Sequence, residues 1–302
     1  MSNPDIRFVK NKDIDYQRWD QCIQDSDNSR VYAYGWYLNI VCPDWAGLIW
    51  GDYEYVMPLP FHKKFGISYL SQPVYAQQLG IFPVPTVNVL KVMLDFLVTR
   101  FDYIRLSLNS MNITDHTGFS VEERRNYTLP LNVPYETITG KYNKNTKRNI
   151  RKFKPSISII KTLVVADYMN LKRNFPGVED DKEFQKSINI IISTSLRRKQ
   201  GIIYSAYSSE NELCAAAYFL FDSKRVSYLN AVSSNIGKEF CAGHVIVDQF
   251  IQDNAQKNIL FDFEGSQNLG VARFYEGFGA ECEHYQHIYR NTLIWPLRIL
   301  KK

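Results

Sequence analysis

The sequence has few cysteines and histidines, and neither residue type is grouped. The chain of 302 residues contains five of each. No Cys-x-x-Cys pair and no cysteine–histidine cluster has the spacing of a zinc site. His284 and His287 lie three residues apart on a predicted strand, so their side chains point to opposite faces. We expect reduced thiols, no metal site and no tightly bound cofactor.

Long apolar runs are missing as well. No segment approaches the ~18 consecutive apolar residues needed to cross a bilayer. The first residues, MSNPDIRFVKNKD, are polar and unlike a signal peptide. The formal net charge of +5 is too mild to indicate a nucleic-acid partner by itself. We therefore expect a cytoplasmic protein with no transmembrane segment and no DNA partner.

Apolar residues are abundant and predict a packed core. They make up 45% of the chain, against 22% charged residues, and the length suits two domains. Aromatic residues reach 14%, an excess that indicates clefts or half-buried core positions.

The two halves of the chain repeat one order of predicted elements. Each has an antiparallel hairpin, a third strand, a helix and a returning strand, which is the pattern of an α/β unit with a mixed sheet. The matched elements start near residues 46 and 201, 53 and 212, 66 and 225, 84 and 243, and 102 and 259. We predict two tandem domains, 1–133 and 134–302, with a basic helix over 135–153 at their junction.

That junction contains the segment KYNKNTKRNIRKFK, which has seven basic residues in fourteen. On a helix, five of them form one continuous face: Lys144, Lys147, Arg148, Arg151 and Lys152. The face is either simply solvated or a platform for an anion. The candidate anions are tRNA phosphates, a nucleotide-linked cell-wall precursor and an anionic lipid head group.

A second segment of interest, FDFEGSQNLGVARFYEGFGAE, begins within the predicted strand 259–263 and continues beyond it. Alternation along this strand places Asp262 and Glu264 on one face. Two neighbouring carboxylates repel, which tends to raise one pKa toward a value useful for a general base. The alternative is structural, with Asp262 capping a helix or pairing with Arg273.

Three stretches, taken with the order of elements, resemble the FemAB-like family of tandem GNAT acyltransferases. They are PLPFHKKFGISYLSQPVYAQQLG, NYTLPLNVPYETITGKYNKNTKRNIRKFK and the FDFEGSQNLGVARFYEGFGAE segment. The resemblance covers nearly the whole chain. It implies two tandem GNAT domains and an N-acyltransferase that passes an acyl or aminoacyl group to a primary amine, such as that of a cell-wall precursor, an amino sugar or a peptide. The alternative is a non-catalytic module of the same fold that binds an anionic ligand.

The resemblance also implies where the donor lies. In such a fold the strands that correspond to 225–232 and 259–263 splay apart, and the donor occupies the gap at their carboxyl ends. Backbone N–H groups near Tyr228 and Asn230 would polarise the acyl carbonyl. Asp262 or Glu264 would be the base. Tyr275 matches the helix tyrosine that protonates a leaving thiolate, although it also suits an aromatic core, and Arg273 is assigned to donor binding.

The loop that would hold a donor pyrophosphate departs from the pattern of acetyl-CoA users, Q/R-x-x-G-x-G/A. In the matching KEFCAG, Lys238 replaces Arg or Gln, Cys241 replaces the middle glycine, and Gly243 is in place. A cysteine at a position of positive φ is less favourable than glycine. The co-substrate is therefore either acyl-CoA or aminoacyl-tRNA. Residues 165–198 leave no room for the helical arm that longer relatives use for tRNA, which weighs against tRNA.

The loop SQPVYAQQLG offers two adjacent amides. Gln77 and Gln78 would either recognise peptide or sugar groups of an acceptor or satisfy backbone groups of a long ordered loop. We expect a monomer, because the second unit takes the place of a dimer partner.

Overall fold

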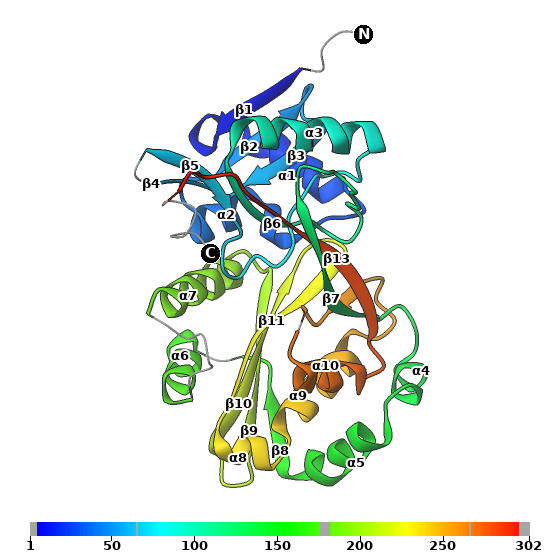
Figure 1. Cartoon of the computed structure of the whole chain (residues 1–302). Helices are drawn as coiled ribbons and strands as arrows, with labels where there is room; N and C mark the ends of the chain where they lie inside the picture. The colour runs from blue at the N-terminus through cyan, green and yellow to red at the C-terminus, as the bar shows by residue number, and fades with distance from the viewer. Residues whose placement is uncertain (1–4, 65, 163, 176–181, 266, 296–302) are drawn as a thin grey trace. The chain divides into compact units, whose positions relative to one another are not determined.

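The computed structural model describes residues 5–64, 66–162, 164–175, 182–265 and 267–295 (Figure 1). The chain divides into two compact units. The first contains residues up to Arg125 together with those from His284 onward, and the second is Asn126–Glu283. This division differs from the predicted boundary at 133/134, because strand β13 (Glu281–Asn291) returns to pair with β6 (Tyr103–Ser107) of the first unit.

The first unit contains two sheets. β1 (Ile6–Lys10), β2 (Ala46–Trp50) and β3 (Tyr55–Leu59) form an antiparallel sheet beside α1 (Tyr16–Asp25) and α2 (Gly35–Val41). A second sheet contains β4 (Phe61–Lys64), β5 (Ile67–Ser71), β6, β13 and the first part of β7 (Ser120–Pro130). Residues 61–64, just before the third predicted strand of this half, thus form a strand of their own. Pro60 separates β3 from β4, since proline has no N–H to donate to a ladder.

Helix α3 (Val87–Arg100) supplies the core of that second sheet. The Thr86 side chain accepts the Val89 N–H and caps the helix start. One face of the helix buries Met93, Leu94 and Leu97 against the strand residues Ile104 and Ile288. The helix predicted to start near residue 84 is confirmed.

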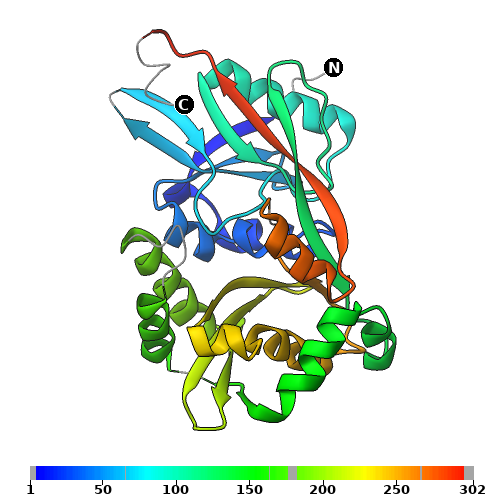
Figure 2. The same ribbon diagram turned by 60° about the horizontal axis from the view of Figure 1, so that its bottom comes forward.

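The second unit is a six-stranded mixed sheet with helices on both faces. Its order is β7, β12 (Leu260–Asp262), β11 (Arg225–Ser233), β10 (Leu213–Phe221), β9 (Gly201–Ser208) and β8 (Ile157–Ile160). Helix α9 (Ala242–Asn254) covers one face, and α6 (Val165–Asn174) and α7 (Lys182–Arg197) cover the other (Figures 1 and 2). The short helices α8 (Asn235–Glu239) and α10 (Leu269–Glu276) flank α9 along the chain.

The repeated order of elements is confirmed in both units. In the first, α3 connects the parallel strands β5 and β6, and in the second, α9 connects the parallel strands β11 and β12. The fold class is therefore mixed α/β, as predicted. Strands β1 and β8 were not predicted, because each is a short strand at the edge of its sheet.

The predicted junction helix over 135–153 is interrupted. It consists of α4 (Tyr135–Gly140) and α5 (Lys144–Phe153), because Asn143 starts a new helix by accepting the Thr146 N–H at 2.8 Å. The buried carboxylate of Asp248 on α9 connects the segment to the core.

Three side chains donate hydrogen bonds to Asp248: Tyr135 Oη at 2.6 Å, Tyr142 Oη at 3.3 Å and Lys154 Nζ at 2.9 Å. Burial, with the nearby carboxylate, raises the pKa of Tyr135 and Tyr142. Both phenols therefore stay protonated and able to donate.

Replacing Asp248 by alanine should lower the free energy of unfolding by about 2–4 kcal/mol, since three buried or half-buried donors lose their acceptor. Urea unfolding followed by circular dichroism measures this loss. Glu210→Ala removes an exposed carboxylate and should stay within about 0.5 kcal/mol of wild type. Equal stability of the two variants would show that Asp248 does not anchor the segment.

Candidate functional site

The parallel strands β11 and β12 separate after three paired residues. Arg225 pairs with Leu260, Val226 with Phe261, and Ser227 with Asp262. Beyond that point β12 ends, whereas β11 continues to Ser233 paired with β10. The predicted splay of these strands is confirmed.

A cavity of about 460 Å³ lies where the strands have parted. Its walls come from β11, from the segment that follows β12, and from α10. The residues that line it are Tyr228, Leu229, Asn230, Ala231, Phe263, Glu264, Gly265, Gly270, Val271, Phe274 and Tyr275. We call this cavity the wedge pocket. Four of the predicted site residues, Tyr228, Asn230, Glu264 and Tyr275, thus come together.

A β-bulge on β11 lies in the wall of the wedge pocket. Tyr218 of β10 pairs with Asn230, and the next residue, Phe219, pairs with Tyr228, so Leu229 is the extra residue. A bulge takes backbone groups out of the ladder and turns them aside. The Asn230 side chain accepts a hydrogen bond from Tyr168 Oη at 2.6 Å, so its carbonyl oxygen is already engaged. The bulge was not predicted, because no residue type marks it.

A buried ion pair joins the two strands across their short paired stretch. Arg225 Nη1 is 2.5 Å from Asp262 Oδ2, and Asp262 is fully buried. Burial opposes the charged form of Arg225, but the nearby carboxylates of Asp262 and Glu283 outweigh it and raise the arginine pKa. The predicted alternative partner, Arg273, is instead exposed on α10 and does not line the wedge pocket.

Asp262 also ends its own strand. Its other oxygen, Oδ1, accepts the N–H of Glu264 at 2.9 Å, and Glu264 adopts a left-handed backbone with φ of 61°. The prediction that Asp262 and Glu264 share one strand face is therefore wrong, since β12 stops at Asp262. Glu264 lines the wedge pocket, whereas Asp262 does not.

Tyr275 belongs both to the wedge pocket and to the core. Its ring lies 4.9 Å from that of Phe263 and 6.4 Å from that of Tyr228, measured between centroids. Burial raises the Tyr275 pKa, and the neighbouring Tyr228, Glu264 and Asp262 add to the effect. Burial likewise raises the Tyr228 pKa. The Tyr275 phenol is thus protonated at neutral pH and able to donate a hydrogen bond.

The predicted phosphate loop surrounds the start of α9. Cys241 precedes the helix with φ of 48°, the left-handed conformation that favours glycine. Gly243 lies in the first turn, and a Cβ added there would meet nothing within 4 Å, so packing does not require a glycine. Lys238 is exposed on α8. These three residues do not line the wedge pocket.

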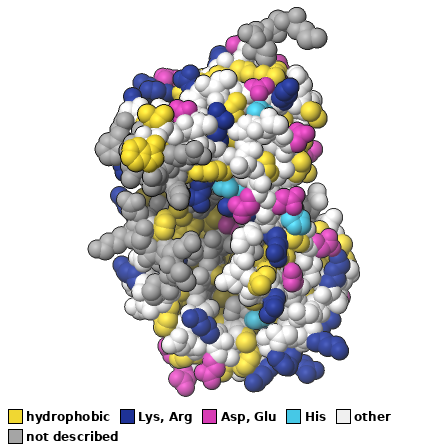
Figure 3. All heavy atoms as spheres, in the orientation of Figure 1, with side chains coloured by type: hydrophobic (Ala, Val, Ile, Leu, Met, Phe, Trp, Pro, Cys, Tyr) yellow, Lys and Arg dark blue, Asp and Glu magenta, His cyan; other side chains and the backbone are white. Residues whose placement is uncertain are grey.

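The basic face of α5 reaches this helix start. All five predicted cations, Lys144, Lys147, Arg148, Arg151 and Lys152, are exposed, and Lys and Arg side chains gather over α5 at the lower right of Figure 3. Burial raises the Cys241 pKa, but Lys152 and Arg148 act against it, which places positive charge close to the start of α9. Arg148 and Lys152 therefore reinforce the positive end of the α9 dipole.

The two predicted acceptor glutamines lie in the first unit and have structural contacts. Gln78 is fully buried, and its Oε1 accepts from Arg30 Nη2 at 3.2 Å and from the Ser110 N–H at 3.1 Å. Its Nε2 donates to Gln77 Oε1 at 2.9 Å. The acceptor role predicted for Gln78 is thus wrong, because its polar atoms hold the loop together.

In the first unit, the loop of residues 71–80 fills the gap between β5 and β6 that corresponds to the wedge pocket of the second unit. Strands β5 and β6 also pair over a short length, Leu70 with Ile104 and Ser71 with Arg105. Beyond it, the Ser107 N–H donates to Gln72 Oε1 at 3.0 Å, and the Leu79 N–H donates to the Ser107 carbonyl at 2.8 Å. The loop therefore closes the gap between these two strands.

The next observations concern metal sites, membrane-spanning helices and cysteines. Across the described residues, no group of three or more His, Cys, Asp or Glu side chains is arranged to hold a metal ion. No helix within the described ranges is both long and apolar enough to cross a membrane. All five cysteines are free thiols.

Solved structures share the fold at low sequence identity. FemX superposes with a TM-score of 0.69 at 12% identity over 95% of this chain and 98% of its own. L-PGS from Bacillus licheniformis gives 0.56 at 13% identity over 95% of both chains. An acetyltransferase of the GNAT family from Colwellia psychrerythraea gives 0.52 at 11% identity over 95% of this chain and 99% of its own. Neither a protein-family profile nor a curated protein sequence matches the chain. The fold is thus the FemAB-like GNAT fold that the sequence predicted.

The Arg225–Asp262 pair predicts a non-additive effect on stability. Asp262→Leu should lower the free energy of unfolding by about 3 kcal/mol or more, because it leaves a buried guanidinium without its main partner. Adding Arg225→Met should recover part of that loss. A double-mutant cycle by urea unfolding measures the coupling. Losses that simply add would mean that the two side chains do not act as a pair.

Proposed function

We propose that the chain is an N-acyltransferase of the FemAB-like type, which passes an acyl or aminoacyl group from a donor in the wedge pocket to a primary amine. The observation that carries the proposal is the separation of β11 from β12 with a cavity between them. Ligands of open α/β sheets bind at the carboxyl ends of strands that diverge in this way. The similarity in fold to a GNAT acetyltransferase and to FemX supports the same class of reaction.

The reaction proceeds by direct attack of the amine on the acyl carbonyl. The amine gives its proton to the Glu264 carboxylate as the new N–C bond forms. Backbone N–H groups at the Leu229 bulge stabilise the oxyanion. The bond from the carbonyl carbon to the leaving sulfur or oxygen then breaks, and the leaving atom takes the proton of the Tyr275 phenol. Both residues line the wedge pocket.

The donor binds through its phosphate groups at the start of α9. That helix end offers unpaired N–H groups and a positive dipole. Arg148 and Lys152 of the basic face add charge beside it. Both donor classes, acyl-CoA and aminoacyl-tRNA, carry phosphates that suit this position. Lys238 on α8 precedes the start of α9 in the sequence, and Gly243 lies in its first turn.

The roles of Glu264 and Tyr275 are tested by removing one proton-transfer group at a time. Glu264→Gln should lower kcat about 10²- to 10⁴-fold while donor affinity stays near wild type, because the amide keeps the shape but accepts no proton. Tyr275→Phe should likewise lower kcat while donor affinity stays near wild type. Transfer to a primary amine is followed by mass spectrometry of the acylated product.

The control Glu136→Gln makes the same chemical change at an exposed position on α4 and should leave kcat unchanged. Full turnover by Glu264→Gln would remove Glu264 from the mechanism. No transfer by the wild type from either donor class would favour a protein that only binds an anionic ligand.

The identity of the donor is tested by binding. Millimolar acetyl-CoA should raise Tm by several degrees if CoA is the donor, since a ligand that binds the native state stabilises it. Arg148→Gln with Lys152→Gln should reduce that shift. No shift with acetyl-CoA, together with aminoacyl-tRNA binding that weakens steeply with salt, would assign the tRNA donor instead. If neither donor binds, the donor site is wrongly placed.

A further inference from the structure

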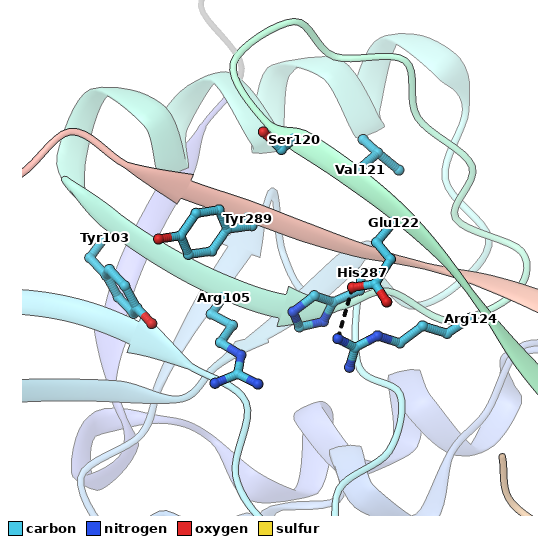
Figure 4. Close-up of a pocket in the computed structure, with 8 residues that line it drawn as sticks. All are labelled: Tyr103, Arg105, Ser120, Val121, Glu122, Arg124, His287 and Tyr289. Carbon is cyan, nitrogen blue, oxygen red and sulfur yellow. Dashed lines mark hydrogen bonds and ion pairs between the residues drawn. The ribbon is translucent and has the colours of Figure 1, made fainter. Parts of the chain in front are cut away.

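A second cavity, of about 500 Å³, lies in the first unit on the face of the sheet opposite the α3 core. It is formed by alternate residues of three strands, which point to one side (Figure 4). They are Tyr103 and Arg105 of β6, His287 and Tyr289 of β13, and Ser120, Glu122 and Arg124 of β7, with Val121 beside them. We call this cavity the sheet-face pocket. It does not involve any residue of the wedge pocket.

Positive charge dominates the sheet-face pocket. Arg105 and Arg124 lie on either side of His287 (Figure 4), and Glu122 is the acid that lines the same cavity. Arg124 Nη2 is 3.0 Å from Glu122 Oε2, and this pair is solvent-exposed on the carboxylate side. Two guanidiniums thus face one carboxylate, and one positive charge in the cavity is left without compensation.

The charge of His287 does not change this balance. Burial lowers the His287 pKa to about 4, and Arg124 and Arg105 add to the effect. The ring is therefore neutral at pH 7, and its Nδ1 is 3.0 Å from Ser107 Oγ, which fixes its orientation. The imidazole acts as a rigid wall between the two arginines.

Two side chains that line the sheet-face pocket each have one N–H or O–H group without an acceptor. Arg124 Nε is buried and has no hydrogen-bond partner, although its Nη2 is paired with Glu122. The Tyr289 hydroxyl accepts a hydrogen bond from Asn291 Nδ2 at 3.1 Å, which leaves its own proton to donate. A buried guanidinium N–H without an acceptor is unusual in a folded protein.

We propose that the sheet-face pocket binds a phosphoryl group. A phosphate monoester is a dianion with three terminal oxygens, and the pocket offers two guanidiniums and a phenol as donors. Arginine binds phosphate in a fork geometry with two parallel N–H donors. A carboxylate, with one charge and two oxygens, would engage only one of the two arginines. This proposal does not depend on the transferase function proposed above.

Calorimetric titration of the full chain with inorganic phosphate, against sodium chloride of equal ionic strength, tests the site. Arg105→Gln and Arg124→Gln should each weaken phosphate binding about tenfold or more, since each removes charged hydrogen bonds. Lys12→Gln, an exposed cation of the same unit that does not line the pocket, should leave the affinity unchanged.

A second measurement does not rely on the folding of the arginine variants. In ¹H–¹⁵N spectra of the wild-type protein, the Nε–H signal of Arg124 should shift saturably with phosphate and not with chloride. The absence of saturable phosphate binding would overturn the proposal. So would unchanged affinity in both arginine variants, or acetate binding as tightly as phosphate.

Discussion

The ion pair between Arg225 and Asp262 is the constraint on which the wedge pocket depends. It joins Arg225, the first paired residue of β11, to Asp262, the last paired residue of β12, and both side chains are buried. Two buried charges must remain together, because leaving either alone costs several kcal/mol. Asp262 then uses its second oxygen for the Glu264 N–H, so the chain turns away from β11. One carboxylate therefore ends the strand, opens the gap and presents Glu264 to it.

The two units share one topology but differ in what occupies the gap between their parallel strands. Each has parallel strands joined by a helix, and in each the strands pair over two or three residues before they part. In the first unit Gln72 and Leu79 take up the hydrogen-bonding groups of Ser107 beyond that point. In the second unit the corresponding groups face a cavity. In the first unit, the sheet-face pocket lies instead on a face of the sheet. There the alternation of side chains along β6 and β7 brings Arg105 and Arg124 to the same side.

Local pattern predicted the elements well, and long-range pairing explains the differences. Apolar residues on one face were enough to predict α3, and Glu264, at the end of the predicted strand 259–263, lines the wedge pocket. The role of Asp262 could not be predicted, because its partner Arg225 is 37 residues away and alternation assumes that a strand continues. Gln78 was misassigned for the same reason, since its partners Arg30 and Ser110 are distant in sequence. The break before α5 was predictable in principle, because Asn143 is a favourable cap residue.

The position of the basic face is set by tertiary contacts and not by the helix itself. Like charges at i and i+4 on α5 repel, so its sequence alone favours the helix weakly. Thr146 on its inner side is buried against Gly277, where a Cβ would lie 2.5 Å from the threonine Oγ1. The Asn143 N–H donates to the Gly277 carbonyl at 3.0 Å, and Asp248 holds the residues on both sides of the helix. These contacts come from α9 and from the end of α10, the two helices that border the proposed donor site. The cations of α5 are therefore held beside the start of α9 by the same packing that shapes the wedge pocket, and this fixed position is what an anion-binding role requires.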